Sequence, residues 1–374
     1  MDLDCDLHLH SPFARGVSRR MTPELLLASS VRKGIGAIGT GDALEPGWRE
    51  AWASYLENEF GIVVIPTVEV QAERRVHHLA LFPDFDAVEV FGDLLTPHTN
   101  ELSGNGRPHV RLSGGEVVCA VHEAGGLAGP AHAFTPWTGV YAAFDSIAAC
   151  YGGERIDLLE LGLSADSSYG AGITELSDVP FISSSDAHSP ELHRLGREFT
   201  RLDVVSPTPS GVLGAVKRAS IVMNVGLYPE EGKYNETACM RCLRHFTLSE
   251  AESSGWRCPA DGTLLRKGVR DRARELSDGP PRPRPPYLHL IPLGEVIAKV
   301  LGLASPNAKG VRVVYDALLT VCHTEIEVLV DLPVEEIYRV HPRVARAIGA
   351  LRQGRVKLHP GGGGCYGTFE FPGT

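Results

Sequence analysis

The residues with the clearest potential for chemistry lie near the N-terminus, in the sequence Asp6-Leu7-His8-Leu9-His10. On a β-strand, His8 and His10 point to one face and the two leucines to the other. Two imidazoles on one side of a strand end form half of a metal site. An isolated His-x-His is more often a pair of half-exposed histidines on an edge strand, so the interpretation depends on the rest of the chain.

Further potential ligands follow other short apolar runs. They are Asp42, Glu69, His77 with His78, His132, and Asp186 with His188. One histidine at a strand end means little, but six successive strand ends that each carry a ligand are hard to explain as core filling. A mixture of imidazole and carboxylate suits Zn²⁺, Mn²⁺ or Fe²⁺. The ligands outnumber the coordination sphere of one ion, so the sequence predicts a multinuclear site.

The elements that must position these residues alternate along residues 1–225. Thr22 is the expected N-cap of a helix with Pro23 at its first position, and a Trp-rich helix is expected over 46–60. Continuous apolar runs predict strands at 35–40, 62–66, 76–81, 127–130, 158–163 and 180–184. This alternation predicts parallel strands covered on both faces. A closed (β/α) barrel, with its chemistry at the C-terminal strand ends, is the favoured architecture.

These motifs together resemble the polymerase and histidinol phosphatase (PHP) superfamily of metal-dependent phosphoesterases. The resemblance implies an α/β fold, a distorted (β/α)7 barrel, with a trinuclear centre. By this resemblance one metal is held by His8, His10, Glu69 and Asp186. A second is held by Glu69, His78 and His132, with His77 as the alternative to His78, and a third by His188 and Asp42. The superfamily's additional histidines are missing, and Arg15, Gly16 and Glu45 occupy their neighbourhoods. Glu45 is therefore an alternative ligand.

Three longer sequence segments resemble one branch of the superfamily, endonuclease Q. They are Pro130–Trp137, Glu160–Asp166 and Lys267–Arg272. The resemblance implies a metal-dependent DNA repair endonuclease that hydrolyses the phosphodiester 5′ to a deaminated base (uracil, hypoxanthine, xanthine) or an abasic site. Asp186, Glu69 and His188 would be catalytic, around two to three Zn²⁺ ions that activate water, with Mg²⁺ or Mn²⁺ as alternatives.

Composition places this chemistry in an ordinary globular protein. Hydrophobic residues make up 43% and charged residues 22% of the chain. No apolar run approaches the ~18 residues that span a bilayer, and the acidic N-terminus does not resemble a signal peptide. The eight cysteines are too dilute for a disulfide scaffold, which favours a cytoplasmic location.

Beyond residue 228 the alternation of apolar runs and helical stretches ends. We therefore predict three domains: a barrel over 1–228, a zinc-ribbon-like domain over 229–276 and a helical DNA-binding region over 277–374. The ribbon ligands are Cys239, Cys242 and Cys258, with Asp261 where the resemblance predicts a fourth cysteine. His245 is a second candidate for that position, and a ribbon without metal is the third alternative. One Zn²⁺ is expected here.

The C-terminal region begins with a proline-rich stretch, 280–286, that predicts a stiff connection. Helices are expected at 293–301, at 311–320 and from 333 onward. Residues 337–369 carry six Lys/Arg and no acid and end in the glycine-rich stretch 360–367. That stretch predicts either a loop that contacts phosphate and base or a disordered tail. The endonuclease Q branch is expected to carry Tyr and Asp inside the loop, where this chain has only glycines.

The net charge of −10 argues against DNA binding only if charge is averaged over the chain. Residues 239–274 carry eight Lys/Arg against four Asp/Glu, so the C-terminal segments can follow a DNA backbone. Candidate DNA contacts are Arg15, Arg19, Arg197, Arg270 and Tyr366, and candidates for the lesion pocket are Phe134, Trp137 and Tyr366. The rival functions are a small-molecule phosphoesterase and a non-catalytic nucleic-acid-binding protein. A sliding clamp is a further partner to consider, but the sequence does not specify one.

Overall fold

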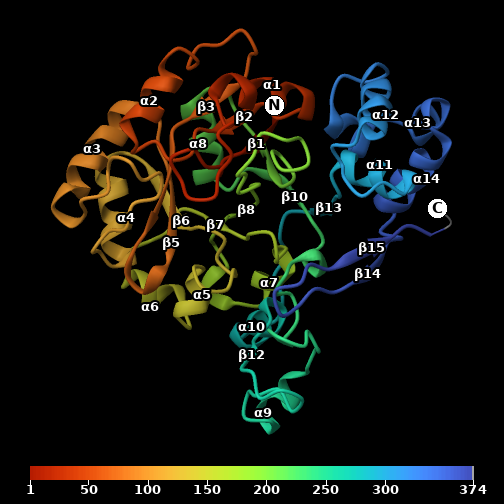
Figure 1. The fold of residues 1–374 in the computed structure, drawn as a ribbon. Coiled ribbons are helices and arrows are strands. Elements are labelled where there is room, and N and C mark those ends of the chain that lie inside the picture. The colour runs from red at the N-terminus through yellow and green to blue at the C-terminus, as the bar shows by residue number, and fades with distance from the viewer. Residues whose placement is uncertain (373–374) are drawn as a thin grey trace.

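The computed structural model describes residues 1–372 (Figure 1). The α-helices are α1 (Pro23–Lys33), α2 (Pro46–Ala53), α3 (Phe85–Leu95), α4 (Gly114–Glu123), α5 (Val140–Ala143), α6 (Ile147–Tyr151), α7 (Ser167–Ala171), α8 (Pro209–Lys217), α9 (Leu248–Ser253), α10 (Val269–Leu276), α11 (Leu293–Leu301), α12 (Lys309–Leu319), α13 (Val334–Val340) and α14 (Pro342–Arg352). The strands are β1 (Asp2–Asp6), β2 (Ala37–Gly39), β3 (Val63–Ile65), β4 (Thr67–Gln71), β5 (His77–Leu81), β6 (Leu127–Pro130), β7 (Leu159–Glu160), β8 (Phe181–Ile182), β9 (Phe199–Asp203), β10 (Ile221–Gly226), β11 (Ala238–Cys239), β12 (Leu265–Arg266), β13 (Tyr287–His289), β14 (Lys357–His359) and β15 (Thr368–Glu370). The protein is a mixed α/β structure.

Two predicted helices show how local sequence sets helix ends. Helix α1 begins as predicted, because the Thr22 hydroxyl accepts a hydrogen bond from the backbone N–H of Leu25 and Pro23 takes the first helical position. Helix α2 ends at Ala53, well before the predicted residue 60. Asn58 explains the difference: its side chain accepts from the N–H of Ile62 and donates to the carbonyls of Tyr55 and Ile62. These bonds fix a turn where the helix was expected to continue.

Strands β1 to β8 follow one another in space, in the order of the sequence. Strands β1, β2 and β3 pair in parallel, and β3 continues into β4 across Pro66. Strands β4, β5 and β6 pair antiparallel, and β7 pairs in parallel with β8. Backbone bonds from Asp157 to Ala128 and from Ala133 to Glu160 connect β6 with β7. A parallel bridge between Leu9 and Ala187 connects the segment after β8 with the segment after β1.

The prediction of parallel strands throughout was wrong. Besides the β4–β5–β6 sheet, β9 pairs antiparallel with both β1 and β10. The full order of the largest sheet is β13-β10-β9-β1-β2-β3. A continuous apolar run indicates that both faces of a strand are buried, and antiparallel strands covered on both faces give the same pattern.

Helices α11 to α14 form a second packed body beside the strands, shown in blue in Figure 1. Its apolar core joins these helices to Ile35, Phe199 and Val225 of the N-terminal part. A smaller core around Cys239, Phe246 and Cys258 lies in the segment that carries α9, which projects away from both bodies (Figure 1). No helix within residues 1–372 has the length and apolarity needed to cross a membrane.

The alternative of a disordered glycine-rich tail was wrong. Residues 360–367 connect the antiparallel strands β14 and β15, and their backbone bonds to Glu230, Glu231, Lys233 and Glu236. A Cβ on Gly363 would lie 2.4 Å from the carbonyl oxygen of Cys239, and the φ of Gly363 is +61°. Glycine is therefore needed here to let the hairpin approach the neighbouring segment.

A buried ion pair joins the two packed bodies. Lys33 at the end of α1 lies 2.7 Å from Glu325, and the side chains are 2% and 0% exposed. Glu325 also accepts from the N–H of Leu293 and from the hydroxyl of Tyr315. An ion pair of this kind stabilises poorly by itself, but removal of one partner leaves a buried charge uncompensated.

We therefore expect Lys33→Met to lower the free energy of unfolding by about 3–5 kcal/mol, measured by urea denaturation followed by circular dichroism. Arg32→Met is the matched control, because Arg32 pairs with Asp316 across the same junction but both side chains are exposed. Exposed pairs contribute about 0–1 kcal/mol. Equal losses in the two variants would contradict this assignment of the buried pair.

Candidate metal centre

His8 and His10 follow β1 directly and are each 1% exposed. The Nδ1 atom of His8 lies 2.8 Å from Glu160, and Nδ1 of His10 lies 2.9 Å from Asp42. The Nε2 atoms of both rings are buried and make no hydrogen bond within residues 1–372. A histidine whose Nδ1 is held by a carboxylate and whose Nε2 is buried without a hydrogen bond has the usual arrangement of a metal ligand.

Glu69 on β4 lies at the centre of the group. Its carboxylate is 2.7 Å from Nδ1 of His77, 3.0 Å from Nε2 of His132 and 2.8 Å from the Arg107 guanidinium. Burial by itself would raise the pKa of Glu69, but His77, His132 and His10 hold it well below its usual value. Glu69 is therefore an ionised carboxylate at the point where cations or imidazoles converge.

Asp186 and His188 complete the arrangement from the end of β8. The Asp186 carboxylate lies 3.2 Å from Nε2 of His10 and 3.5 Å from Nε2 of His188. The backbone of Asp186 has a φ of +46°, and Asp42 and His132 have φ values of +47° and +30°. Residues other than glycine rarely adopt this conformation, and they do so most often at functional sites.

Three ligand groups result, and they share members. Each group has ligand atoms within 4.8 Å of one another: His8, His10 and Glu69; Glu69, His77 and His132; and His10, Asp186 and His188. Glu69 belongs to two groups and His10 to two, so the groups form one continuous cluster. This geometry is that of a candidate metal site.

The structure places His77, and not His78, in this cluster. Successive side chains of β5 point to opposite faces, and its antiparallel register with β4 turns His77 toward Glu69. His78 points away, and its Nδ1 lies 2.9 Å from the hydroxyl of Tyr151. Burial lowers the pKa of His78 to about 3, so this imidazole is neutral within the core. The resemblance to the motif favoured the wrong member of the pair.

Two other predicted ligands also lie outside the groups. Asp42 orients His10 and accepts from the backbone and hydroxyl of Ser11. Glu45 caps α2 through the N–H of Gly47 and also accepts from the N–H of Gly104. The carboxylate of Asp42 therefore supports a ligand, and that of Glu45 fixes a loop.

Sequence reasoning missed Glu160 and Arg107. Glu160 ends the short strand β7, and the apolar residues before it gave the same signal as at the other strand ends. Arg107 lies in an irregular segment, where no sequence pattern marks it. Its contact with Glu69 exists only because the segment folds over the cluster.

The predicted DNA contacts differ in their surroundings. Arg15 and Arg19 are exposed. The Nε of Arg197 donates to the carbonyl of Ser185, directly beside Asp186. Arg270 pairs with Glu236 at 2.7 Å. Tyr366 is 62% exposed, with the Lys233 ammonium 4.4 Å from its ring centroid. Among the three lesion-pocket candidates, Phe134 is buried, whereas Trp137 and Tyr366 are exposed.

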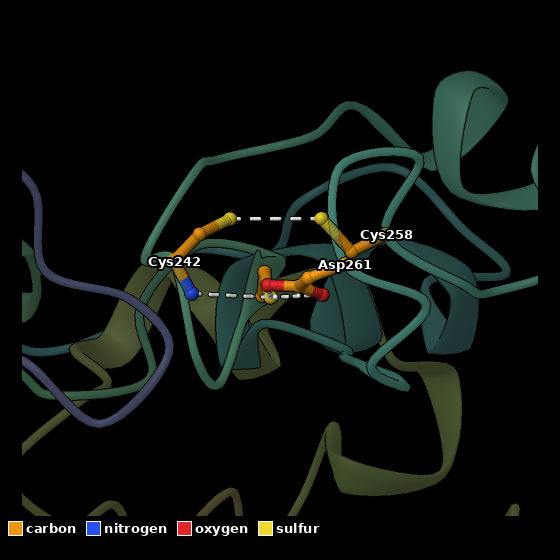
Figure 2. A group of neighbouring side chains, drawn as sticks. Cys242, Cys258 and Asp261 are labelled. Carbon is orange, nitrogen blue, oxygen red and sulfur yellow. Dashed lines mark hydrogen bonds between the residues drawn. The ribbon is translucent and has the colours of Figure 1, made fainter.

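A second potential metal site lies in the segment with α9. Cys239, Cys242, Cys258 and Asp261 bring one ligand atom each to within 4.8 Å of one another. The sulfurs of Cys242 and Cys258 are 3.5 Å apart, and both carboxylate oxygens of Asp261 lie 3.6 Å from the sulfur of Cys239 (Figure 2). The Nδ1 of His245 lies 2.7 Å from Glu236, outside this group.

Comparison with solved structures gives two matches over the whole chain. One is the crystal structure of the lesion-specific endonuclease PfuEndoQ from Pyrococcus furiosus, with 42% identity, a TM-score of 0.95 and coverage of 100% of this chain and 96% of that chain. The other is an endonuclease Q in complex with a 27-mer duplex that has an abasic lesion at the active site. It has 42% identity, a TM-score of 0.94 and coverage of 100% and 97%.

Two curated relatives and one family model also match. Protein MJ0043 of Methanocaldococcus jannaschii is 43% identical over 246 residues, which are 64% of this chain but only 31% of MJ0043. Protein YqxK of Bacillus subtilis is 34% identical over 305 residues, covering 79% of this chain and 74% of YqxK. The family model described as the MJ0043 C-terminal domain matches residues 292–355.

Proposed function

Because the chain belongs to the endonuclease Q branch of the PHP superfamily, we propose that it is a metal-dependent DNA repair endonuclease. It hydrolyses the phosphodiester 5′ to a deaminated base or an abasic site and leaves 3′-hydroxyl and 5′-phosphate ends. The observation that carries the proposal is the buried cluster around Glu69, in which imidazoles and carboxylates converge. A protein that only binds nucleic acid has no need for such a cluster.

The cluster residues would hold two to three divalent ions. His8, His10 and Glu69 would bind one, Glu69 with His77 and His132 a second, and His10, Asp186 and His188 would surround the third position. The buried Nε2 atoms of His8 and His10, which make no hydrogen bond, and Nε2 of His132, 3.0 Å from Glu69, fit this role. Bound ions there supply Lewis-acid activation of water and of the scissile phosphate. Zn²⁺ suits the donor set, with Mg²⁺ or Mn²⁺ as alternatives.

The other residues of the site orient these groups. Glu160 and Asp42 hold the imidazoles of His8 and His10 so that each directs Nε2 inward. The carboxylate of Glu69 takes part in two ligand groups. Arg107 brings a permanent positive charge to its edge, where it can also bind a phosphate oxygen.

A cavity beside the cluster suits the lesion nucleotide. It has a volume of about 280 Å³, and Arg194, Arg197 and Tyr366 are among its lining residues. Arg197 also contacts the backbone of Ser185, next to Asp186, so this one side chain connects the cavity with the cluster. A damaged nucleotide turned out of the duplex can enter such a cavity. DNA is the partner that the comparisons support, and none of them names a sliding clamp.

The circle of strands β1 to β8 fits the distorted (β/α)7 barrel of this superfamily, over residues 1–228. Residues 229–276 form the zinc-ribbon-like domain, in which Cys239, Cys242, Cys258 and Asp261 hold one Zn²⁺. Residues 277–374 form the helical DNA-binding region, of which 373 and 374 lie outside the described residues. The ribbon ligands in Figure 2 lie at separations close to those of a tetrahedral site.

We expect Cys258→Ser to lower the zinc content by one ion per chain and to loosen residues 239–274, because a structural zinc ion contributes to folding directly. Zinc bound at the barrel cluster should remain. Metal analysis by mass spectrometry and hydrogen exchange measure the two effects. Cys119→Ser is the matched control, since Cys119 is exposed and outside every ligand group. Unchanged zinc content and melting in Cys258→Ser would show that the ribbon holds no metal.

The function itself is tested with purified protein, Mg²⁺ or Mn²⁺, and a labelled duplex that carries a single uracil, inosine or abasic site. The expected product is a single nick 5′ to the lesion, with no nick in the undamaged duplex. Release of phosphate from small phosphomonoesters without any nick would instead indicate a small-molecule phosphoesterase. DNA binding without either reaction would indicate a non-catalytic protein.

A further inference from the structure

The molecule has a second cavity that the proposed reaction does not use. Its volume is about 340 Å³, and it lies between the loop after β6 and the ribbon. Its walls contain three aromatic side chains, Phe134, Trp137 and Tyr141, and three cations, Arg266, Lys267 and Arg272, but no carboxylate. Aromatic faces with surrounding positive charge are the combination that binds nucleotides.

Trp137 is the unusual member of this wall. It is 44% exposed and has a φ of +82°, a conformation that a bulky residue adopts only when the surroundings impose it. The loop is fixed at both sides of Trp137, because the N–H of His77 donates to the carbonyl of Thr138 and the N–H of Gly139 to that of Thr135. The fold thus holds a partly exposed indole five positions after the proposed ligand His132.

Arg266 faces this indole from strand β12. Its guanidinium carbon lies 3.3 Å from the centroid of the Trp137 ring. The other two cations already have partners: Lys267 pairs with Glu275 and Arg272 with Asp145. Arg266 makes no ion pair or side-chain hydrogen bond within residues 1–372. Its charge is therefore available to an anion outside the protein.

We propose that this cavity, with Trp137 as the stacking surface and Arg266 as the phosphate contact, binds a second nucleotide of the DNA, outside the lesion cavity. The inference rests on the proposed function. The cavity shares a loop with His132 but lies on the ribbon side. A nucleotide bound there contacts both the ribbon and the loop after β6. These contacts hold the duplex in register with the metal cluster. Trp137 and Arg266 are positioning residues, since neither touches the reacting atoms.

The experiment titrates the protein with an abasic-site duplex and records tryptophan fluorescence, affinity and its salt dependence. Stacking on the indole should quench the emission of Trp137, and Trp137→Phe should remove that change. Trp137→Ala should weaken binding about 10- to 100-fold, in the range of one lost base-stacking contact, with Trp137→Phe weakened less. Arg266→Ala should lower the slope of log K against log salt by about 0.9, the value for one phosphate contact, whereas Trp137→Ala leaves the slope unchanged.

The control is Trp256→Phe, because Trp256 lies in the ribbon with Lys267 over its ring but outside the cavity lining. It should keep the fluorescence change and the affinity. If the wild type nicks lesions but Trp137→Ala binds them normally, the inference fails and the proposed function stands. The contact between Trp137 and Arg266 would then only connect the loop after β6 to the ribbon. If the wild type nicks no lesion, the proposed function fails, and this nucleotide site loses its basis.

Discussion

Asp186→Asn should lower the rate of nicking by about 10³-fold or more, the scale of losing a core electrostatic element of an active site. The substitution keeps the size of the side chain but removes the negative charge that balances a bound dication. Asp186 lies between Nε2 of His10 and Nε2 of His188, so the ion held there should bind weakly. Binding of a lesion duplex should survive, because cations distant from the cluster contribute to phosphate contact.

A nicking assay and a gel shift on the same abasic-site duplex measure both quantities. Asp178→Asn is the matched control, since Asp178 is exposed and lines a cavity that contains no member of the cluster. Its nicking rate should equal that of the wild type. A rate near the wild-type value in Asp186→Asn would mean that the chemistry does not take place at this cluster.

The neighbouring residues His77 and His78 should give opposite results when each is replaced by alanine. His77→Ala removes a group that lies 2.7 Å from Glu69, and the nicking rate should fall about 10²-fold or more together with the content of bound metal. His78→Ala instead creates a cavity beside Tyr151, so the melting temperature should fall while the nicking rate stays close to that of the wild type.

Nicking kinetics, metal analysis and thermal melting of both variants test this contrast. Each variant serves as the control for the other, because the two residues are adjacent, of the same type, and almost equally buried. If His78→Ala lost metal and activity while His77→Ala kept both, the register of β5 against β4 would have to be wrong.

The sequence by itself determined the types of residue at the site and most of their positions. His8, His10, Glu69, His132, Asp186 and His188 all lie in the cluster, because each follows or interrupts a short apolar run that forms a strand. Local signals also determined the start of α1 and the exact extent of α11. Such signals depend on near neighbours in the chain, and near neighbours are visible in the sequence.

Tertiary structure decided what near neighbours cannot specify. A shift of one residue in strand register exchanges the two faces, so the pairing of β5 with β4 chose His77 over His78. Asp42 and Glu160 became supports of His10 and His8 only because three separate segments meet at one place. Arg107 and the Trp137–Arg266 contact likewise join residues far apart in the chain. Their distances depend on the packing of whole elements, and no local pattern encodes that packing.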